Sequence, residues 1–196
     1  MFRESLDFPI DHSELSSSEM NDPTRLLYWE NNLKDLNTIY LQADFIINNK
    51  LTNIIQSIFF TLPKHLITKL SSQFPHYNTE QILLTHFYAL LYRYSNQTDI
   101  CLGVATASHS PLENSSYLPL RLQFDSEIHI SELLNLLNKT INTHFINQLP
   151  LESIQKIIQI NSEEITSSPF NIYFNTHSQK LDKKNSFLAE KNNNNF

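Results

Sequence analysis

The sequence predicts an α/β fold, an α+β sandwich in which helices pack on a mixed sheet. Three observations support this prediction. Residues 79–95 repeat apolar side chains at helical spacing, and residues 100–105 form a short apolar run typical of a buried strand. Amphipathic patterns at residues 23–36 and 131–147 predict two further helices. Long helices separated by short apolar runs favour helices layered on a sheet.

The stretch 77–106 is the centre of this prediction. Asn78 and Thr79 provide a capping signal, and Glu80 places negative charge in the first helical turn. The polar triplet at 95–97 then ends the helix, and residues 100–105 continue as the strand. The expected apolar stripe of the helix consists of Leu83, Phe87, Leu90, Leu91 and Tyr94, widened by Ile82, Leu84 and Tyr88.

The segment before this helix also carries an ordered pattern. Asp22 and Pro23 form a helix-start signal, and Trp29 in the helix that follows is interpreted as a packing anchor against the sheet. Residues 53–63 alternate in the manner of a strand, and the alternation Ile54, Gln56, Ile58 and Phe60 predicts one buried face. A short helix is expected after Pro63, with Leu66, Leu70 and Phe74 directed inward.

A second long helix is expected near the C-terminal end. Ser131 is the predicted N-cap, and residues 151–160 give another short helix before the strand-like run 167–175. The expected apolar face of the long helix consists of Leu133, Leu134, Leu137, Ile141 and Phe145.

Composition excludes several classes of protein. The chain has 196 residues, 40% of them apolar, which is enough for one folded domain with a core. A net charge of -6 gives no basic surface for nucleic acid or for an anionic membrane. No apolar run reaches the length of a membrane span and no signal-peptide core is evident, so the cytoplasm is the expected compartment.

The numbers of glycine and cysteine residues exclude several kinds of binding and catalytic site. Gly103 is the only glycine, which excludes glycine-rich phosphate loops and dinucleotide fingerprints. Cys101 is the only cysteine, which excludes an internal disulfide and a multi-cysteine zinc site. Its position inside the predicted strand favours a buried hydrophobic role over a nucleophilic one. No histidine or carboxylate pair has metal-ligand spacing, so no metal site is predicted.

Several motifs carry a resemblance to a known family. The segment LLYRYSNQTDICLG, residues 90–103, resembles the pattern "LLxRYSxQxDIxxG" of condensation domains from nonribosomal peptide synthetases. These domains belong to the chloramphenicol-acetyltransferase-like superfamily. The order of further matches agrees: residues 5–14 resemble "YxDYAVWQxE", 26–33 "LxYWxxxL", 146–154 "HQDLPFExL" and 167–175 "SPLFxVxFN".

The resemblance implies one lobe of a two-lobed fold. It covers most of residues 5–175 and corresponds to the C-terminal lobe, incomplete at its end. The expected organisation is a polar N-terminal segment at 1–20, a partial condensation-domain lobe at 21–176, and an asparagine-rich tail of disorder-like composition at 177–196.

The resemblance also implies a reaction, amide-bond formation between carrier-bound acyl and aminoacyl thioesters. The domain would bind no cofactor itself, because the carriers present phosphopantetheine arms. The family's "HHxxxDG" motif is absent, since no two of the eight histidines are adjacent. We therefore predict no catalytic residue and no activity of the chain alone. The implied partners are a chain bearing the N-terminal lobe and peptidyl carrier proteins.

Two kinds of candidate site residue are expected, one from the resemblance and one from the pattern of apolar residues. Residues 118–121 resemble the end of the motif "GxFVNTLxLR", whose Asn and Thr would fall at Ser116 and Tyr117, so these two are substrate-channel candidates by resemblance. Arg93 and Arg121 are the charges set most deeply in apolar patterns, and each is expected to need a carboxylate. Asp99 is a plausible local partner for Arg93.

Two alternatives remain open at the level of the sequence. The chain could be a non-enzymatic interaction module or a decayed synthetase remnant, self-associating or binding a partner through an exposed apolar face. It could also be part of a related carrier- or CoA-dependent acyltransferase, because the superfamily shares the lobe.

Overall fold

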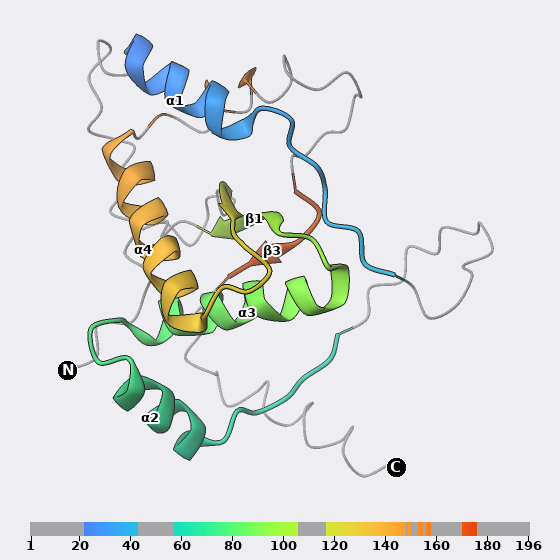
Figure 1. Ribbon diagram of the computed structural model, residues 1–196, viewed down its shortest axis with the longest axis vertical. Coiled ribbons are helices and arrows are strands. Elements are labelled where there is room, and N and C mark those ends of the chain that lie inside the picture. Colours follow the sequence, from blue (N-terminus) through green and yellow to red (C-terminus); the bar gives the residue numbers. More distant parts are fainter. Residues whose placement is uncertain are drawn as a thin grey trace, which may run out of the picture.

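A computed structural model describes residues 22–42, 57–105, 117–147 and 170–175, with 149, 153–154 and 156–157 (Figure 1). The N-terminal segment and the asparagine-rich tail lie outside these residues. Of the short helix expected at 151–160, residues 153–154 and 156–157 are described, and they are helical. None of the described helices combines the length and the hydropathy needed to cross a membrane.

The sheet has three strands in the order β2-β1-β3 among the described residues. Strand β1 (Asp99–Ala105) is central and pairs antiparallel with β2 (Tyr117–Gln123), with Leu102 opposite Leu120. It pairs parallel with β3 (Tyr173–Phe174) on its other edge. The sheet is therefore mixed, as predicted, and the expected central strand is confirmed.

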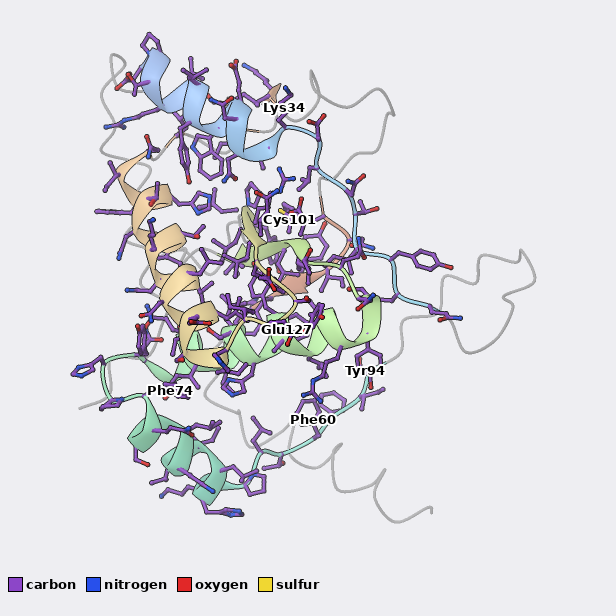
Figure 2. The ribbon with its side chains drawn as sticks, viewed as in Figure 1. Lys34, Phe60, Phe74, Tyr94, Cys101 and Glu127 are labelled. Carbon is purple, nitrogen blue, oxygen red and sulfur yellow. The ribbon has the colours of Figure 1, made fainter. Side chains whose placement is uncertain are left out.

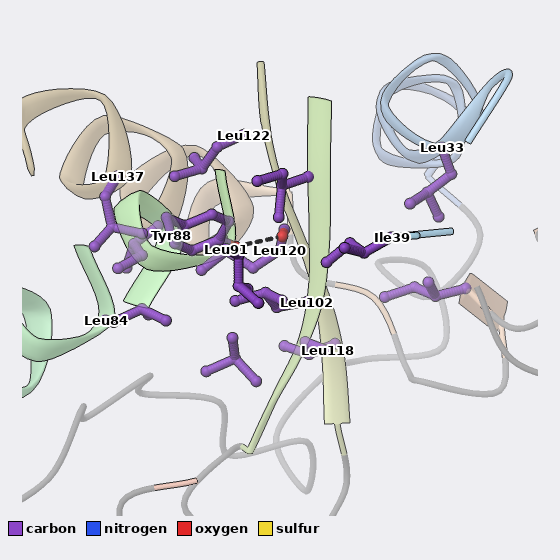
Figure 3. Close-up of a cluster of buried hydrophobic side chains, with 14 of the residues drawn as sticks. Leu33, Ile39, Leu84, Tyr88, Leu91, Leu102, Leu118, Leu120, Leu122 and Leu137 are labelled. Atoms are coloured by element: carbon purple, nitrogen blue, oxygen red, sulfur yellow. Dashed lines mark hydrogen bonds between the residues drawn. The ribbon is translucent and has the colours of Figure 1, made fainter. Parts of the chain in front are cut away.

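Helices cover both faces of this sheet. Helix α3 (Thr79–Ser95) and helix α4 (Ile130–Ile146) pack on one face, while helix α1 (Pro23–Leu33) and the chain after it lie on the other. Figure 3 shows Tyr88 and Leu137 on one side of the strands and Leu33 and Ile39 on the other. The five central residues of β1 are buried for this reason.

Helix α3 begins where the sequence predicts. The side chain of Asn78 accepts a hydrogen bond from the Gln81 backbone N–H at 2.7 Å, and the Gln81 side chain accepts one from the Asn78 N–H at 3.0 Å. This reciprocal pair satisfies two donors that a helix start leaves open. The helix ends at Asn96, which takes the left-handed conformation with φ of 55°.

The buried face of α3 differs from the expected stripe. Leu90 and Tyr94 are exposed, whereas the buried set is Ile82, Leu84, Thr85, Tyr88 and Leu91. The residues expected only to widen the stripe therefore form its centre. Tyr88 explains this rotation in part, because its hydroxyl donates to the Leu120 carbonyl at 2.6 Å from a fully buried position (Figure 3).

Helix α1 confirms its predicted start. Asp22 is the N-cap and accepts from the Thr24 backbone N–H at 2.8 Å, and Pro23 occupies the first helical position. Trp29 is buried, as a packing anchor should be, but its ring stacks on a side chain of α4. Its indole N–H donates to the Asn147 carbonyl at 2.8 Å, just beyond the end of that helix.

Helix α4 departs from the sequence prediction at both ends. It begins after His129, whose backbone N–H donates to Glu132 at 3.0 Å, so Ser131 lies inside the helix and does not cap it. Phe145 is exposed, and the neighbouring His144 is buried in its place. The cause is the aromatic contact between His144 and Trp29, which draws the polar ring into the core.

The largest departure concerns residues 57–74. Helix α2 (Lys64–Gln73) forms after Pro63 as predicted, but none of its residues is buried, and Leu66 is exposed. Leu70 and Phe74 are half-buried. Ile58 and Phe60 were expected on a buried strand face, yet both are exposed, while residues 54 and 56 lie outside the described part of the chain.

Candidate functional site

Arg121 joins three parts of the fold. It lies on β2, where its Nε and Nη2 donate to the two carboxylate oxygens of Asp99 on β1. Its Nη1 donates to the backbone carbonyls of Asn32 at 2.8 Å and Lys34 at 2.7 Å, at the end of α1. The last carbonyls of a helix have no partner within the helix, so Arg121 satisfies them and fastens α1 to the sheet.

The charge of this pair is fixed by its surroundings. Partial burial raises the pKa of Asp99, but hydrogen bonds from Arg121 and Gln123 and the Arg121 charge outweigh it, so the pKa falls below its usual value. The hydrogen bond to Asp99 raises the pKa of Arg121 further. Both groups are therefore ionised near neutral pH, and Asp99 is a weak base.

A polar cleft opens beside this pair. It has a volume of about 820 Å³ and lies between α1, α4 and the strand ends that carry Asp99, Arg121 and Gln123. Its other walls are formed by Tyr28, Asn31, Asn32, Lys34 and Asp35 from α1 and the following turn, and by Leu136, Lys139, Thr140 and Thr143 from α4. In Figure 2 the label Lys34 marks the end of α1, which is part of this wall.

The cleft can bind polar groups, but it holds no assembled catalytic apparatus among the described residues. No histidine lines it, and its central carboxylate is paired with Arg121. Cys101 lies nearby on β1, where burial raises the pKa of its thiol to about 12, so almost no thiolate exists at neutral pH. No cluster of three metal-ligating side chains occurs within the described ranges.

His144 is a buried titratable residue of a type that often acts as a catalytic acid or base. Its ring stacks on Trp29 with centroids 4.6 Å apart and lies edge-on to Tyr28 at 5.8 Å. Burial lowers the pKa of His144 to about 4, against a weaker opposing effect of a backbone hydrogen bond at Thr140. The ring is therefore neutral at pH 7 and serves as an aromatic core residue.

The structure separates the residues predicted from the sequence. Asp99 pairs with Arg121 and not with Arg93, which is exposed near the end of α3. Arg93 was expected to be one of the most deeply set charges, but it is exposed, because the face of α3 that carries it points to solvent. A positive charge there is instead favourable near the negative end of the helix dipole.

Of the two channel candidates, Ser116 lies outside the described residues and Tyr117 is the first residue of β2. The Tyr117 ring packs edge-to-face against Tyr173 of β3, with centroids 4.8 Å apart and planes at 75°. Tyr117 therefore takes part in packing across the sheet, and the structure does not bring it to the cleft at Asp99 and Arg121.

The α4 wall of the cleft was not predicted from the sequence. Leu136, Lys139, Thr140 and Thr143 recur at spacings of three and four residues, which places them on one helical face. That pattern was available as a polar stripe beside the apolar one. The stripe lines a cleft only because α1 lies opposite it. That is a tertiary contact, which the periodicity of the sequence does not predict.

Comparisons with known proteins point to one fold. No protein-family model and no curated protein sequence matches the chain. Among solved structures, the chain is similar to the starter condensation domain of rhizomide synthetase RzmA, as a double mutant in a "product-released" conformation. That match has a TM-score of 0.52 and 15% identity, and covers 77% of this chain and 35% of that one. The domain without mutations matches at a TM-score of 0.44 and 18% identity, over 76% of this chain and 31% of that one.

The comparison confirms the fold that the motifs predicted. The chain spans about a third of the length of the condensation domain to which it is similar, and its helices and mixed sheet correspond to part of that domain. The motif resemblance and the structural likeness arise from different properties, side-chain identity in one case and backbone arrangement in the other. Both lead to the same result: this chain has a condensation-domain-like fold.

Proposed function

We propose that this chain is a condensation-domain-like lobe of nonribosomal peptide synthesis that does not catalyse amide-bond formation alone. The observation that carries the proposal is the match to a condensation domain over only 35% of that domain's length. The reaction needs two carrier-bound thioesters positioned together, and one lobe offers only part of the surface that would hold them.

The chemistry of the described residues supports the same proposal. A general base for the attacking amine should have a pKa near neutrality and lie within reach of the substrate. His144 is buried with a pKa of about 4, and Asp99 is held by Arg121. No two histidines of the sequence are adjacent, so the family's "HHxxxDG" motif has no counterpart here. A second chain with that motif would be the partner, acting with peptidyl carriers in the cytoplasm.

Single-turnover assays test this proposal. The purified chain would be mixed with a donor acyl-carrier thioester and an acceptor aminoacyl-carrier thioester, and amide product would be followed by mass spectrometry. We expect no product from the chain alone, and product when a separately expressed lobe containing the "HHxxxDG" motif is added. Turnover by the isolated chain would overturn the first part, and the absence of product with any added lobe would overturn the second.

A non-enzymatic interaction module is the second candidate. The observation that favours it is the run Ile58, Phe59 and Phe60, whose side chains are 80–89% exposed. Contiguous exposed apolar groups of this size mark interaction surfaces in soluble proteins. The same assay separates the candidates, because an interaction module yields no product with any added lobe.

A further inference from the structure

Residues 57–63, Ser-Ile-Phe-Phe-Thr-Leu-Pro, form the least covered apolar segment of the described chain. Ile58 is 89% exposed, Phe59 85% and Phe60 80%, and Leu62 is also exposed. Figure 1 shows the segment as a drawn-out stretch leading into α2, and Figure 2 shows Phe60 on it. The alternation in this region is that of a buried strand. The sequence is therefore suited to a covered strand, and the described fold leaves it uncovered.

Residues 57–62 belong to no helix or strand. No backbone hydrogen bond joins them to another described residue, and the first acceptor is the Pro63 carbonyl, which receives Leu66 N–H at 2.9 Å. The N–H and C=O groups of an apolar segment outside a sheet are a template for strand pairing. The segment also lacks the lysine or glycine that commonly protects such an edge, and Pro63 stands only at its end.

We propose that this segment pairs with the same segment of a second copy of the chain, as an antiparallel two-stranded ribbon centred on Phe59. Two identical strands in this register place Phe59 opposite Phe59 and Ile58 opposite Phe60. Aromatic and β-branched cross-strand pairs of this kind are stabilising. The arrangement is two-fold symmetric, so both copies use the same edge of the segment. The proposal is limited to this one pair, and the opposite edge of each strand takes no part in it.

The absence of charge in the segment and its exposed apolar area are both compatible with a second copy of the chain as the partner. The seven residues carry no charge, so nothing repels at the centre. Lys64 lies five residues from Phe59, and the two copies of Lys64 would stand about 30 Å apart at opposite ends of the ribbon, beyond the Debye length of about 8 Å. At about 200 Å² for each large side chain, the exposed apolar groups of two copies provide at most roughly 1,000 Å². That is the lower limit for a specific interface, so we expect a weak, concentration-dependent dimer.

Sedimentation velocity of the full chain tests the proposal. We expect the mass to rise from 22.9 kDa to twice this value with concentration and to stop there. Phe59→Lys places like charges opposite each other at the centre and should leave a monomer at every concentration. The matched control is Leu27→Lys, at an exposed apolar position on α1, which should dimerise as the native chain does. A monomeric native chain, or a Phe59→Lys chain that still dimerises, would overturn the proposal.

Cysteine crosslinking tests the register directly. Because residues whose numbers sum to 118 stand opposite each other, Phe59→Cys should form a disulfide-linked dimer under mild oxidation. Ser57→Cys and Thr61→Cys should each remain uncrosslinked and should crosslink when mixed. The native Cys101 is buried, so we expect it to form no disulfide between copies in this assay. Crosslinking in a different register, or growth beyond two copies, would contradict the centred ribbon. So would a native monomer that instead captures an added condensation-domain lobe through Phe59.

This inference does not depend on the proposed condensation function, although it rests on the same exposed run, residues 58–60, as the second candidate, the interaction module. The dimer would form in the absence of carriers and thioesters, and the assays read mass and crosslinking only. Loss of the proposed reaction would leave them unchanged.

Discussion

The indole of Trp29 stacks on the imidazole of His144, with ring centroids 4.6 Å apart and planes inclined by 19°. The contact joins α1 to α4 at a point where both side chains are buried. Nε2 of His144 has no hydrogen-bond partner among the described residues, which suits a neutral ring held by packing. The pair therefore connects the two faces of the fold through an interaction that protonation would disrupt.

Acid should destabilise the protein through His144. Its pKa is about 4 in the folded chain against an ordinary value of 6.5, so folding favours the neutral ring. The resulting stability is fully present above pH 6.5 and is lost as the pH falls from 6.5 towards 4. The loss should reach roughly 3 kcal/mol at the lower limit. Urea unfolding at a series of pH values measures it.

His144→Phe provides the control for this titration. It keeps an aromatic ring against Trp29 and removes the titratable group, so the decline in stability between pH 6.5 and 4 should largely disappear. Asp99 contributes little to the change in stability between pH 6.5 and 4, because with its lowered pKa most of its contribution is lost only as the pH falls below the ordinary value of 3.8. An unchanged decline in His144→Phe would assign the effect to other groups.

Arg121→Lys should destabilise the fold, although it keeps the charge. Lysine cannot reproduce the bidentate contact with Asp99 together with the two carbonyl contacts at the end of α1. Because the Asp99 side chain is 33% exposed, we expect about 2 kcal/mol, below the 3–5 kcal/mol of a fully buried pair. Chemical denaturation measures the change.

A double-mutant cycle that combines Arg121→Lys with Asp99→Asn measures the coupling energy between the two residues. The coupling between positions 99 and 121 should be favourable, and Arg93→Lys on the exposed face of α3 should be neutral within about 0.5 kcal/mol. Additive effects at 99 and 121 would mean that the contact contributes little to stability.

Gly103→Ala should destabilise the junction of β1 and β3. A Cβ at this position would lie 2.8 Å from the Tyr173 ring and closer still to the Phe170 ring. We expect a loss of about 1–3 kcal/mol from overpacking. Adding Phe170→Ala should recover part of the clash cost while creating a cavity, so the double variant should be less destabilised than the sum of the single ones. Strict additivity would exclude this contact as the cause.

Tyr88→Phe should cost about 1 kcal/mol. The variant removes the 2.6 Å hydrogen bond from the fully buried Tyr88 hydroxyl to the Leu120 carbonyl. Tyr94→Phe is the matched control, because Tyr94 is 72% exposed on the same helix and should show no effect. Equal effects of both substitutions would show that the hydroxyl of Tyr88 has no special role.

Cys101 should be inert in the native protein. Burial raises its thiol pKa to about 12, so a thiol-specific reagent at pH 8 should react only as fast as the protein unfolds. Adding urea should accelerate labelling in step with the loss of structure. Rapid labelling under native conditions would show an accessible thiolate and would restore a nucleophilic role to this residue.

The sequence by itself determined the local elements and the fold. The starts of α1 and α3 depend on Asp22, Pro23 and Asn78, whose effects act within one helical turn, so they can be read from neighbouring residues. The length and β-branched content of residues 100–105 were enough to predict a central strand. The order of motifs then predicted the condensation-domain-like fold that the structural comparison confirms.

Only the tertiary structure decided which faces are covered and which charges meet. Asp99 and Arg121 are 22 residues apart in the chain and become partners because β1 and β2 pair antiparallel, a register that spacing cannot supply. His144 is buried because Trp29 of α1 lies against it, and hydropathy alone placed Phe145 there instead. Residues 58–60 have the pattern of a buried strand, yet the described fold leaves them exposed. A periodic pattern states that a face is suited to burial, whereas the arrangement of other elements decides whether anything covers it.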